Sequence, residues 1–145
     1  MIKIICVGKL KEKYLVDLCD DYFNRIKKYH KINIINIKDN DDISKEEKAI
    51  LPLLNGKECT IYLDIKGKKL SSKGFAKLIN ETFINYGCIT FLIGGSNGVT
   101  DVIKDKCNYL LSFSDFTLPH GLFRGVLLEQ IYRAFKINNN EGYHK

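Results

Sequence analysis

Apolar positions along this chain follow two different spacings. Five short runs are almost continuously apolar, which is typical of strands buried on both faces. These runs predict strands at residues 2–7, 32–37, 60–64, 88–93 and 109–113, with a loop at 65–68 after the third. Between the runs, apolar residues recur every three or four positions, which is typical of amphipathic helices. This spacing predicts a helix at about 15–29, short helices after 44 and 100, a helix with its apolar face at 75–83, and a last helix at about 122–137.

Strands that alternate with helices and are apolar on both faces favour a mostly parallel sheet covered by helices on both sides, an α/β fold. The length of 145 residues is that of one domain, and no repeat or linker divides it. We therefore expect a single domain over residues 1–145.

Polar residues at the helix starts suggest caps. Ser44 and Glu47 have the spacing of a capping box, in which the side chain of each residue accepts from the backbone N–H of the other. Ser71 or Ser72 is expected to cap the third helix, and Thr100 or Asp101 the fourth.

The last helix is apolar nearly all round rather than along one stripe. Such a helix is buried on more than one side. Two interpretations remain open: a subunit interface of a two-fold dimer, which we favour, or a central core helix. The apolar residues are Leu122, Phe123, Val126, Leu127, Leu128, Ile131, Tyr132, Ala134 and Phe135.

Composition excludes several classes of protein. The longest apolar runs are far shorter than the ~18 residues of a membrane span, and the N-terminal strand has no signal-peptide cleavage pattern, so we expect a cytoplasmic protein. The five cysteines contain no Cys-x-x-Cys pair, which favours buried thiols over disulfides and predicts no metal site. The net charge of +6 is spread evenly, so it favours a nucleic-acid partner only modestly.

Two loops follow apolar strands and carry the candidate chemistry. Residues 94–98 read Gly-Gly-Ser-Asn-Gly, and residues 113–120 read Phe-Ser-Asp-Phe-Thr-Leu-Pro-His. Loops at the same ends of neighbouring parallel strands form a ligand-binding crevice. Neither a triphosphate P-loop nor a dinucleotide fingerprint is present. The apolar residues Phe116, Leu118 and Pro119 suit a flat ring such as adenine; alternatively they cover the end of the core, and the glycine loop is a tight turn.

A set of segments along the whole chain resembles the SPOUT methyltransferases, and within them the bacterial 23S rRNA (pseudouridine-N3) methyltransferases. The segments are Val-Gly-Lys at 7–9, Leu-Asp at 63–64 with Gly-Lys at 67–68, Leu-Ile-Gly-Gly at 92–95, Leu-Pro-His at 118–120, Glu-Gln-Ile-Tyr-Arg-Ala at 129–134 and Tyr-His-Lys at 143–145. The resemblance implies a C-terminal deep trefoil knot, a homodimer, and S-adenosylmethionine (SAM) as cofactor. The cofactor residues it implies are Leu63, Gly94, Gly95, Phe113, Ser114, Asp115, Phe116, Thr117 and Leu118.

The implied reaction is methylation of N3 of a pseudouridine in 23S rRNA. N3 carries a proton at neutral pH, so a general base or a relaying water is expected. The resemblance implies that His144, with Tyr143 and Lys145, closes over the substrate from one or the other subunit; the alternative is a disordered end. His120, in the second loop, is a further candidate for proton handling or for orienting the last helix.

The expected partner is 23S rRNA within the assembled ribosome, because no appended RNA-binding domain is present. Arg124 and Arg133 could contact RNA phosphate or form ordinary ion pairs. Gly125 departs from the family pattern and is disfavoured in a helix by ~1 kcal/mol relative to Ala, unless close packing uses it. The alternative functions are another SPOUT RNA methyltransferase, acting on a ribose 2′-oxygen or a tRNA base, and a non-catalytic RNA- or ribosome-binding scaffold.

Overall fold

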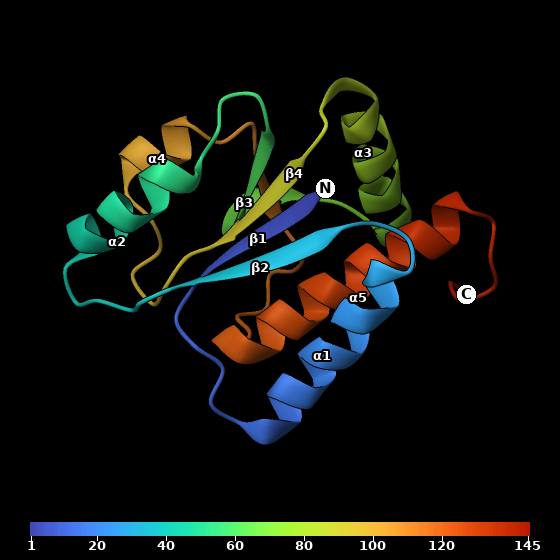
Figure 1. The fold of residues 1–145 in the computed structure, drawn as a ribbon, viewed down its shortest axis with the longest axis horizontal. Helices are drawn as coiled ribbons and strands as arrows, with labels where there is room; N and C mark the ends of the chain where they lie inside the picture. The colour runs from blue at the N-terminus through green and yellow to red at the C-terminus, as the bar shows by residue number, and fades with distance from the viewer.

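A computed structural model describes residues 1–145 and has a single five-stranded sheet (Figure 1). The strands are β1 (Ile2–Val7), β2 (Ile32–Ile37), β3 (Cys59–Lys69), β4 (Ile89–Ile93) and β5 (Tyr109–Ser112). The helices are α1 (Lys13–Lys27), α2 (Ile43–Ile50), α3 (Ser72–Asn85), α4 (Asp101–Asp105) and α5 (His120–Asn138), with a short 3₁₀ helix at Leu51–Leu53. No helix combines the length and apolar character needed to cross a membrane.

All neighbouring strands are parallel, in the order β2-β1-β4-β3-β5. Helices α1, α3 and α5 cover one face of the sheet, and α2 and α4 cover the other (Figure 1). The predicted α/β class is therefore confirmed. The carboxyl ends of all five strands meet at one edge, which positions the loops that follow them.

The continuous apolar runs are explained by burial on both faces. In β1, Ile4 packs with the helices of one face and Ile5 with those of the other, and both are fully buried. In β4, Phe91 and Leu92 likewise pack on opposite faces of the sheet. Because successive side chains of a strand point to opposite faces, a sheet covered twice requires apolar residues at every position.

The third strand is longer than predicted, and the expected loop at 65–68 belongs to it. The pairing of β3 with β5 shifts register, so that Leu111 is opposite both Leu63 and Lys68. Gly67 permits this close approach, since a Cβ there would lie 2.6 Å from the backbone nitrogen of Leu111. The sequence pattern missed this because residues 64–69 are mostly polar.

The predicted capping box at Ser44 and Glu47 is wrong. Asp42 caps α2 instead, and its Oδ1 accepts from the backbone N–H of Ser44 at 3.0 Å. Glu47 accepts from the hydroxyl of Thr100 at 2.6 Å, which fastens α2 to α4. The caps predicted at Ser71 and Thr100 are confirmed.

Helix α5 lies between α1 and α3 against the sheet (Figure 1). Leu127, Leu128 and Ile131 are fully buried within one chain, so the core-helix interpretation accounts for its wide apolar surface. A Cβ on Gly125 would lie 2.6 Å from Cδ2 of Leu18, so close packing against α1 uses this glycine. The subunit interface is not needed to explain the pattern, and the homodimer and the trefoil knot stay predictions.

Candidate functional site

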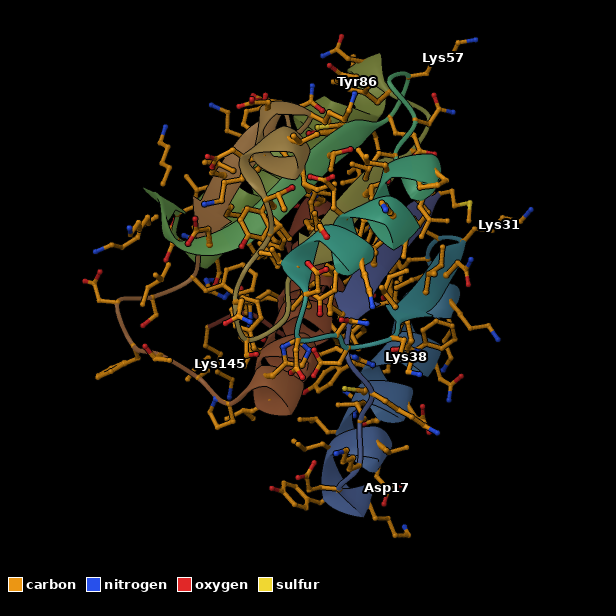
Figure 2. The ribbon with its side chains drawn as sticks, turned by 90° about the vertical axis from the view of Figure 1, so that its left-hand side faces the viewer. Asp17, Lys31, Lys38, Lys57, Tyr86 and Lys145 are labelled. Atoms are coloured by element: carbon orange, nitrogen blue, oxygen red, sulfur yellow. The ribbon has the colours of Figure 1, made fainter.

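A cavity of about 1130 Å³ opens at the carboxyl edge of the sheet. Strands β1, β2, β4 and β5 contribute to its wall through their last residues or the loops that follow. Strand β3 contributes its middle residues, 62–65, and the first turn of α5 completes the wall. Figure 2 views the molecule from this side, with Lys38 labelled just after the end of β2. The cavity lies where the two sequence-predicted loops were expected to form a crevice.

The structure brings together all but one of the residues expected to bind a cofactor. Asp115 is the exception: its Oδ2 lies 2.6 Å from Nζ of Lys69, and both side chains are exposed. The other expected cofactor residues all line the cavity: Leu63, Gly94, Gly95, Phe113, Ser114, Phe116, Thr117 and Leu118.

The glycines after β4 lie where a side chain would be crowded, Gly94 by its own loop and Gly95 by β1. A Cβ on Gly94 would lie 3.0 Å from the carbonyl carbon of Gly98, and one on Gly95 would lie 3.0 Å from Cγ1 of Val7. Gly98 has φ +71°, a conformation that side chains disfavour. The three glycines at 94, 95 and 98 are therefore explained in part by a tight turn. Gly94 and Gly95 nevertheless line the cavity.

The loop after β5 covers part of the core and also presents apolar surface to the cavity. The ring of Phe113 packs against Phe75 and Phe123, with centroids 5.7 and 5.5 Å apart, and so covers the end of the core. Phe116 is 82% exposed beside the cavity, and its backbone N–H donates to Ser114 Oγ at 2.9 Å. An exposed aromatic ring on a loop fixed in this way can stack on a flat ligand.

The other half of the cavity, at the ends of β1 and β2, went largely unrecognised in the sequence. Asn36, Lys38 and Asp39 line this half together with Lys9 and Lys11. Asn36 lies in β2, Lys38 and Asp39 follow it, and no motif marks them. Only the pairing of β1 with β2 brings them beside the glycine loop.

Arg124 does not form the RNA contact or the surface ion pair considered for it. Its side chain is buried, with the residue only 3% exposed. Nη1 donates to Oδ1 of Asn36 at 3.0 Å, and Nη2 donates to the carbonyl oxygen of Gly8 at 3.2 Å. Arg124 therefore fastens α5 to the ends of β1 and β2, behind the cavity wall.

His120 stands at the start of α5 and lines the cavity. Its Nε2 is buried without a hydrogen-bond partner and lies 3.6 Å from where a Cβ on Gly8 would be. Burial, and then the nearby charge of Arg124, lower the pKa of His120. The imidazole is therefore biased towards its neutral form.

A buried carboxyl group lies beneath the glycine loop. Glu46 is 4% exposed, and its Oε2 accepts from the backbone N–H of Asn40 at 2.8 Å. Its Oε1 and Oδ1 of Asp39 both lie within 3.5 Å of where a Cβ on Gly95 would be. Burial, with a smaller contribution from Asp39, raises the pKa of Glu46.

The predicted catalytic tail is ordered but does not line this cavity. Tyr143 and His144 pack on α1 and α5, and Lys145 is exposed. Figure 1 shows the C-terminus at the end of the molecule opposite the start of α5, where the cavity lies. The alternative of a disordered end is wrong for Tyr143 and His144, and their catalytic role stays a prediction.

No group of three or more His, Cys, Asp or Glu side chains is placed to hold a metal ion. All five cysteines are free and are buried or half-buried. Burial raises the pKa of the Cys6 thiol to about 11, which keeps it protonated and unreactive at neutral pH.

Comparisons with known proteins bear on this site. Residues 1–144 match a family model described as "Predicted SPOUT methyltransferase". The chain is 43% identical over 157 residues to "Ribosomal RNA large subunit methyltransferase H" of Clostridium botulinum, covering 99% of each chain. It is 42% identical to the protein of that name from Lactobacillus johnsonii, again over 99% of each chain.

Among solved structures, the chain is similar to a "probable methylase family protein" from Haemophilus influenzae, with a TM-score of 0.58. The match covers 96% of this chain and 66% of that one, at 14% sequence identity. At that identity the similarity concerns the fold alone.

Proposed function

Because the chain belongs to the SPOUT methyltransferase family, and within it to the ribosomal RNA large subunit methyltransferases H, we propose that it methylates N3 of a pseudouridine in 23S rRNA with SAM as methyl donor. The observation that carries this proposal is the match over 99% of both chains, at 43% identity. The cavity supports it, since it gathers all the residues expected to bind the cofactor except Asp115.

The cavity fits an adenosyl cofactor together with part of a substrate. Its volume of about 1130 Å³ slightly exceeds the ~300–1,000 Å³ typical of sites for one small ligand. Leu63, Leu118 and Phe116 offer apolar surface for the adenine, and Gly94 and Gly95 bring backbone close to it. When bound, SAM supplies an electrophilic methyl group on a sulfonium.

The protein's own contribution is alignment and proton handling. Holding the nucleophile in line with the methyl carbon is worth up to ~7–11 kcal/mol of the barrier. The N3 proton must leave before or during transfer, so an acceptor or a water must reach it. His120, Asp39 and Asp64 line the cavity and are the candidate proton acceptors there.

We further propose that the tail residues Tyr143, His144 and Lys145 act on the cavity of a second copy in a homodimer. Within one chain these residues are absent from the cavity wall. In such a dimer, the tail of each subunit would stay packed on its own α1 and α5 and would reach the cavity of the other subunit. A two-fold arrangement makes both sites equivalent.

Mixing two inactive variants tests this arrangement. Thr117→Trp should fill the cavity from an exposed loop without disturbing the core, and His144→Ala removes the tail's imidazole. Random mixing of subunits should restore roughly a quarter of wild-type methylation, because half of the dimers then hold one intact site. No recovery from a mixture shown to contain heterodimers would contradict a tail that acts across the interface.

The assembled ribosome, rather than free RNA, is the proposed substrate. The net charge of +6 is spread evenly along residues 1–145, so no concentrated basic segment marks a surface for reading RNA. The expected result is fast methylation of ribosomes or large subunits and slow methylation of naked rRNA fragments. Equal rates would contradict this part of the proposal.

Calorimetry with SAM separates the enzyme from a scaffold that retains only the fold. The enzyme should bind SAM, and Thr117→Trp should abolish the binding while keeping the wild-type unfolding midpoint. An absence of heat with the wild-type protein would favour the non-catalytic alternative.

A further inference from the structure

The C-terminal tail closes a continuous chain of hydrogen bonds between α1 and α5. The hydroxyl of Tyr143 lies 3.2 Å from that of Tyr22 on α1 and 3.1 Å from Oε1 of Glu129 on α5. Arg133, one turn further along α5, contacts the same Glu129 oxygen from Nε and Nη2, at 2.8 and 2.7 Å. Its remaining terminal nitrogen, Nη1, lies 3.0 Å from Nδ1 of His144.

The chemistry of these groups fixes the direction of each bond. A carboxylate only accepts, so Tyr143 donates to Glu129, and the Tyr143 oxygen then accepts from Tyr22. Burial raises the pKa of Tyr143, which keeps its hydroxyl a donor. A guanidinium only donates, so His144 Nδ1 must be the acceptor of the bond from Arg133.

This bond determines the form of the imidazole. A neutral imidazole has one N–H and one acceptor nitrogen, and an imidazolium has no acceptor. With Nδ1 accepting, His144 is neutral and carries its hydrogen on Nε2.

We propose that Arg133 is a positioning residue that holds His144 with its hydrogen on Nε2, so that His144 meets the target base as a hydrogen-bond donor and not as the proton acceptor. The inference rests on the proposed function, in which the tail contacts the substrate. It assigns different tasks to the tail residues: Tyr143 anchors the tail, and His144 performs the contact.

The packing around Arg133 supports a fixed geometry. Its guanidinium lies 4.7 Å from the centroid of the Tyr143 ring, which itself stands edge-on to Tyr132 at 4.9 Å. The side chains of Arg133 and Glu129 are only 24% and 19% exposed. An imidazole held by a half-buried, doubly paired guanidinium has few alternative orientations.

A donor at this position suits the reaction. As the N3–methyl bond forms and the sulfur–methyl bond breaks, the N3 proton leaves, to water or to a carboxylate such as Asp39. Negative charge that develops at N3 spreads onto the two neighbouring carbonyl oxygens of the base. An N–H aimed at one of these oxygens stabilises that charge, as donors do in oxyanion holes.

Nitrogen NMR of the histidine-labelled, full-length protein reads the tautomer directly, without SAM or RNA. The chain has three histidines, and His144→Ala identifies the signal of interest. The expected wild-type pattern is a protonated Nε2 and an unprotonated Nδ1. Arg133→Met, which keeps length but has no donor, should give a mixture of tautomers.

Ribosome methylation by the same variants supplies the second readout. Arg133→Met should lower kcat about tenfold or more with little change in KM, because the lost contact strengthens in the transition state. Arg133→Lys keeps a donor and should recover part of both the tautomer and the rate. Arg25→Met is the matched control, since Arg25 also lies over the Tyr22 and Tyr132 rings but makes no bond to His144.

A proton on Nδ1 of His144 in the wild-type protein would overturn the inference even if ribosomes are methylated. Full kcat in a folded Arg133→Met variant would overturn it as well. If the wild-type protein methylates no RNA, the proposed function fails, whereas the NMR result still reports whether Arg133 sets the tautomer.

Discussion

Nη1 of Arg124 lies 3.0 Å from Oδ1 of Asn36, which joins α5 to the end of β2. The same guanidinium donates to the carbonyl oxygen of Gly8 at 3.2 Å, after the end of β1. The half of the cavity opposite the cofactor loops is thus held in place by one buried side chain. The hydrogen-bond acceptors of Arg124 are neutral, so its buried charge is stabilised by hydrogen bonds and not by an ion pair.

Arg124→Met should destabilise the fold by about 1–3 kcal/mol, because the half-buried carbonyl of Gly8 loses a charged hydrogen-bond donor and α5 loses its link to Asn36. Urea unfolding at neutral pH measures the change. Arg25→Met, which removes an exposed arginine paired with Asp21, should hardly move the midpoint. Equal effects of the two substitutions would contradict the structural role given to Arg124.

Gly67→Ala should destabilise the fold by about 3 kcal/mol, at the upper end for overpacking, because its Cβ would meet the backbone of Leu110 and Leu111 at 2.6–2.7 Å. Backbone cannot yield as a side chain can. Gly56→Ala is the matched control, since nothing lies within 4 Å of its Cβ position. Similar unfolding midpoints for the two variants would show that β3 and β5 do not approach so closely.

His120 should make stability depend on pH. Its pKa is lowered in the folded state, by burial first and then by Arg124, so below about pH 6.5 the unfolded chain binds a proton that the folded chain does not. The free energy of unfolding should therefore fall as pH decreases from about 6.5 toward the lowered value. His120→Gln should make the free energy of unfolding depend less on pH in this range, as measured by urea unfolding at several pH values. An unchanged pH dependence would mean that groups other than His120 cause it.

Glu46→Gln should raise the thermal midpoint at pH 7. The folded-state pKa of Glu46 is raised, mainly by burial, so its stabilising contribution is present at low pH and is lost as pH rises through that value. Glutamine keeps an acceptor for the backbone N–H of Asn40 without the buried charge. Glu47→Gln, whose carboxylate accepts from Thr100, is the control. A lower midpoint for Glu46→Gln alone would mean that the ionised carboxylate is favoured there.

The sequence predicted the elements that depend on local pattern. The bounds of β1 and β2 agree with the apolar runs at 2–7 and 32–37, although only β1 is buried on both faces and β2 lies at the edge of the sheet. The two specialised loops do border one cavity, as the rule for parallel sheets requires.

What the sequence did not predict depends on contacts between distant residues. The pairing of residues 68 and 69 with β5 follows from the absence of a side chain at Gly67, and polar periodicity gives no hint of it. Arg124 is buried where it bonds to the ends of β1 and β2, whereas an arginine near a helix start is normally expected at the surface. The docking of Tyr143 depends on Tyr22, far away along the chain.

The most direct test of the central claim is mass spectrometry of 23S rRNA from a strain lacking the gene for this protein. N3-methylpseudouridine should disappear, return with the wild-type gene, and stay absent with Thr117→Trp. A methylpseudouridine that persists in the deletion strain would contradict the account.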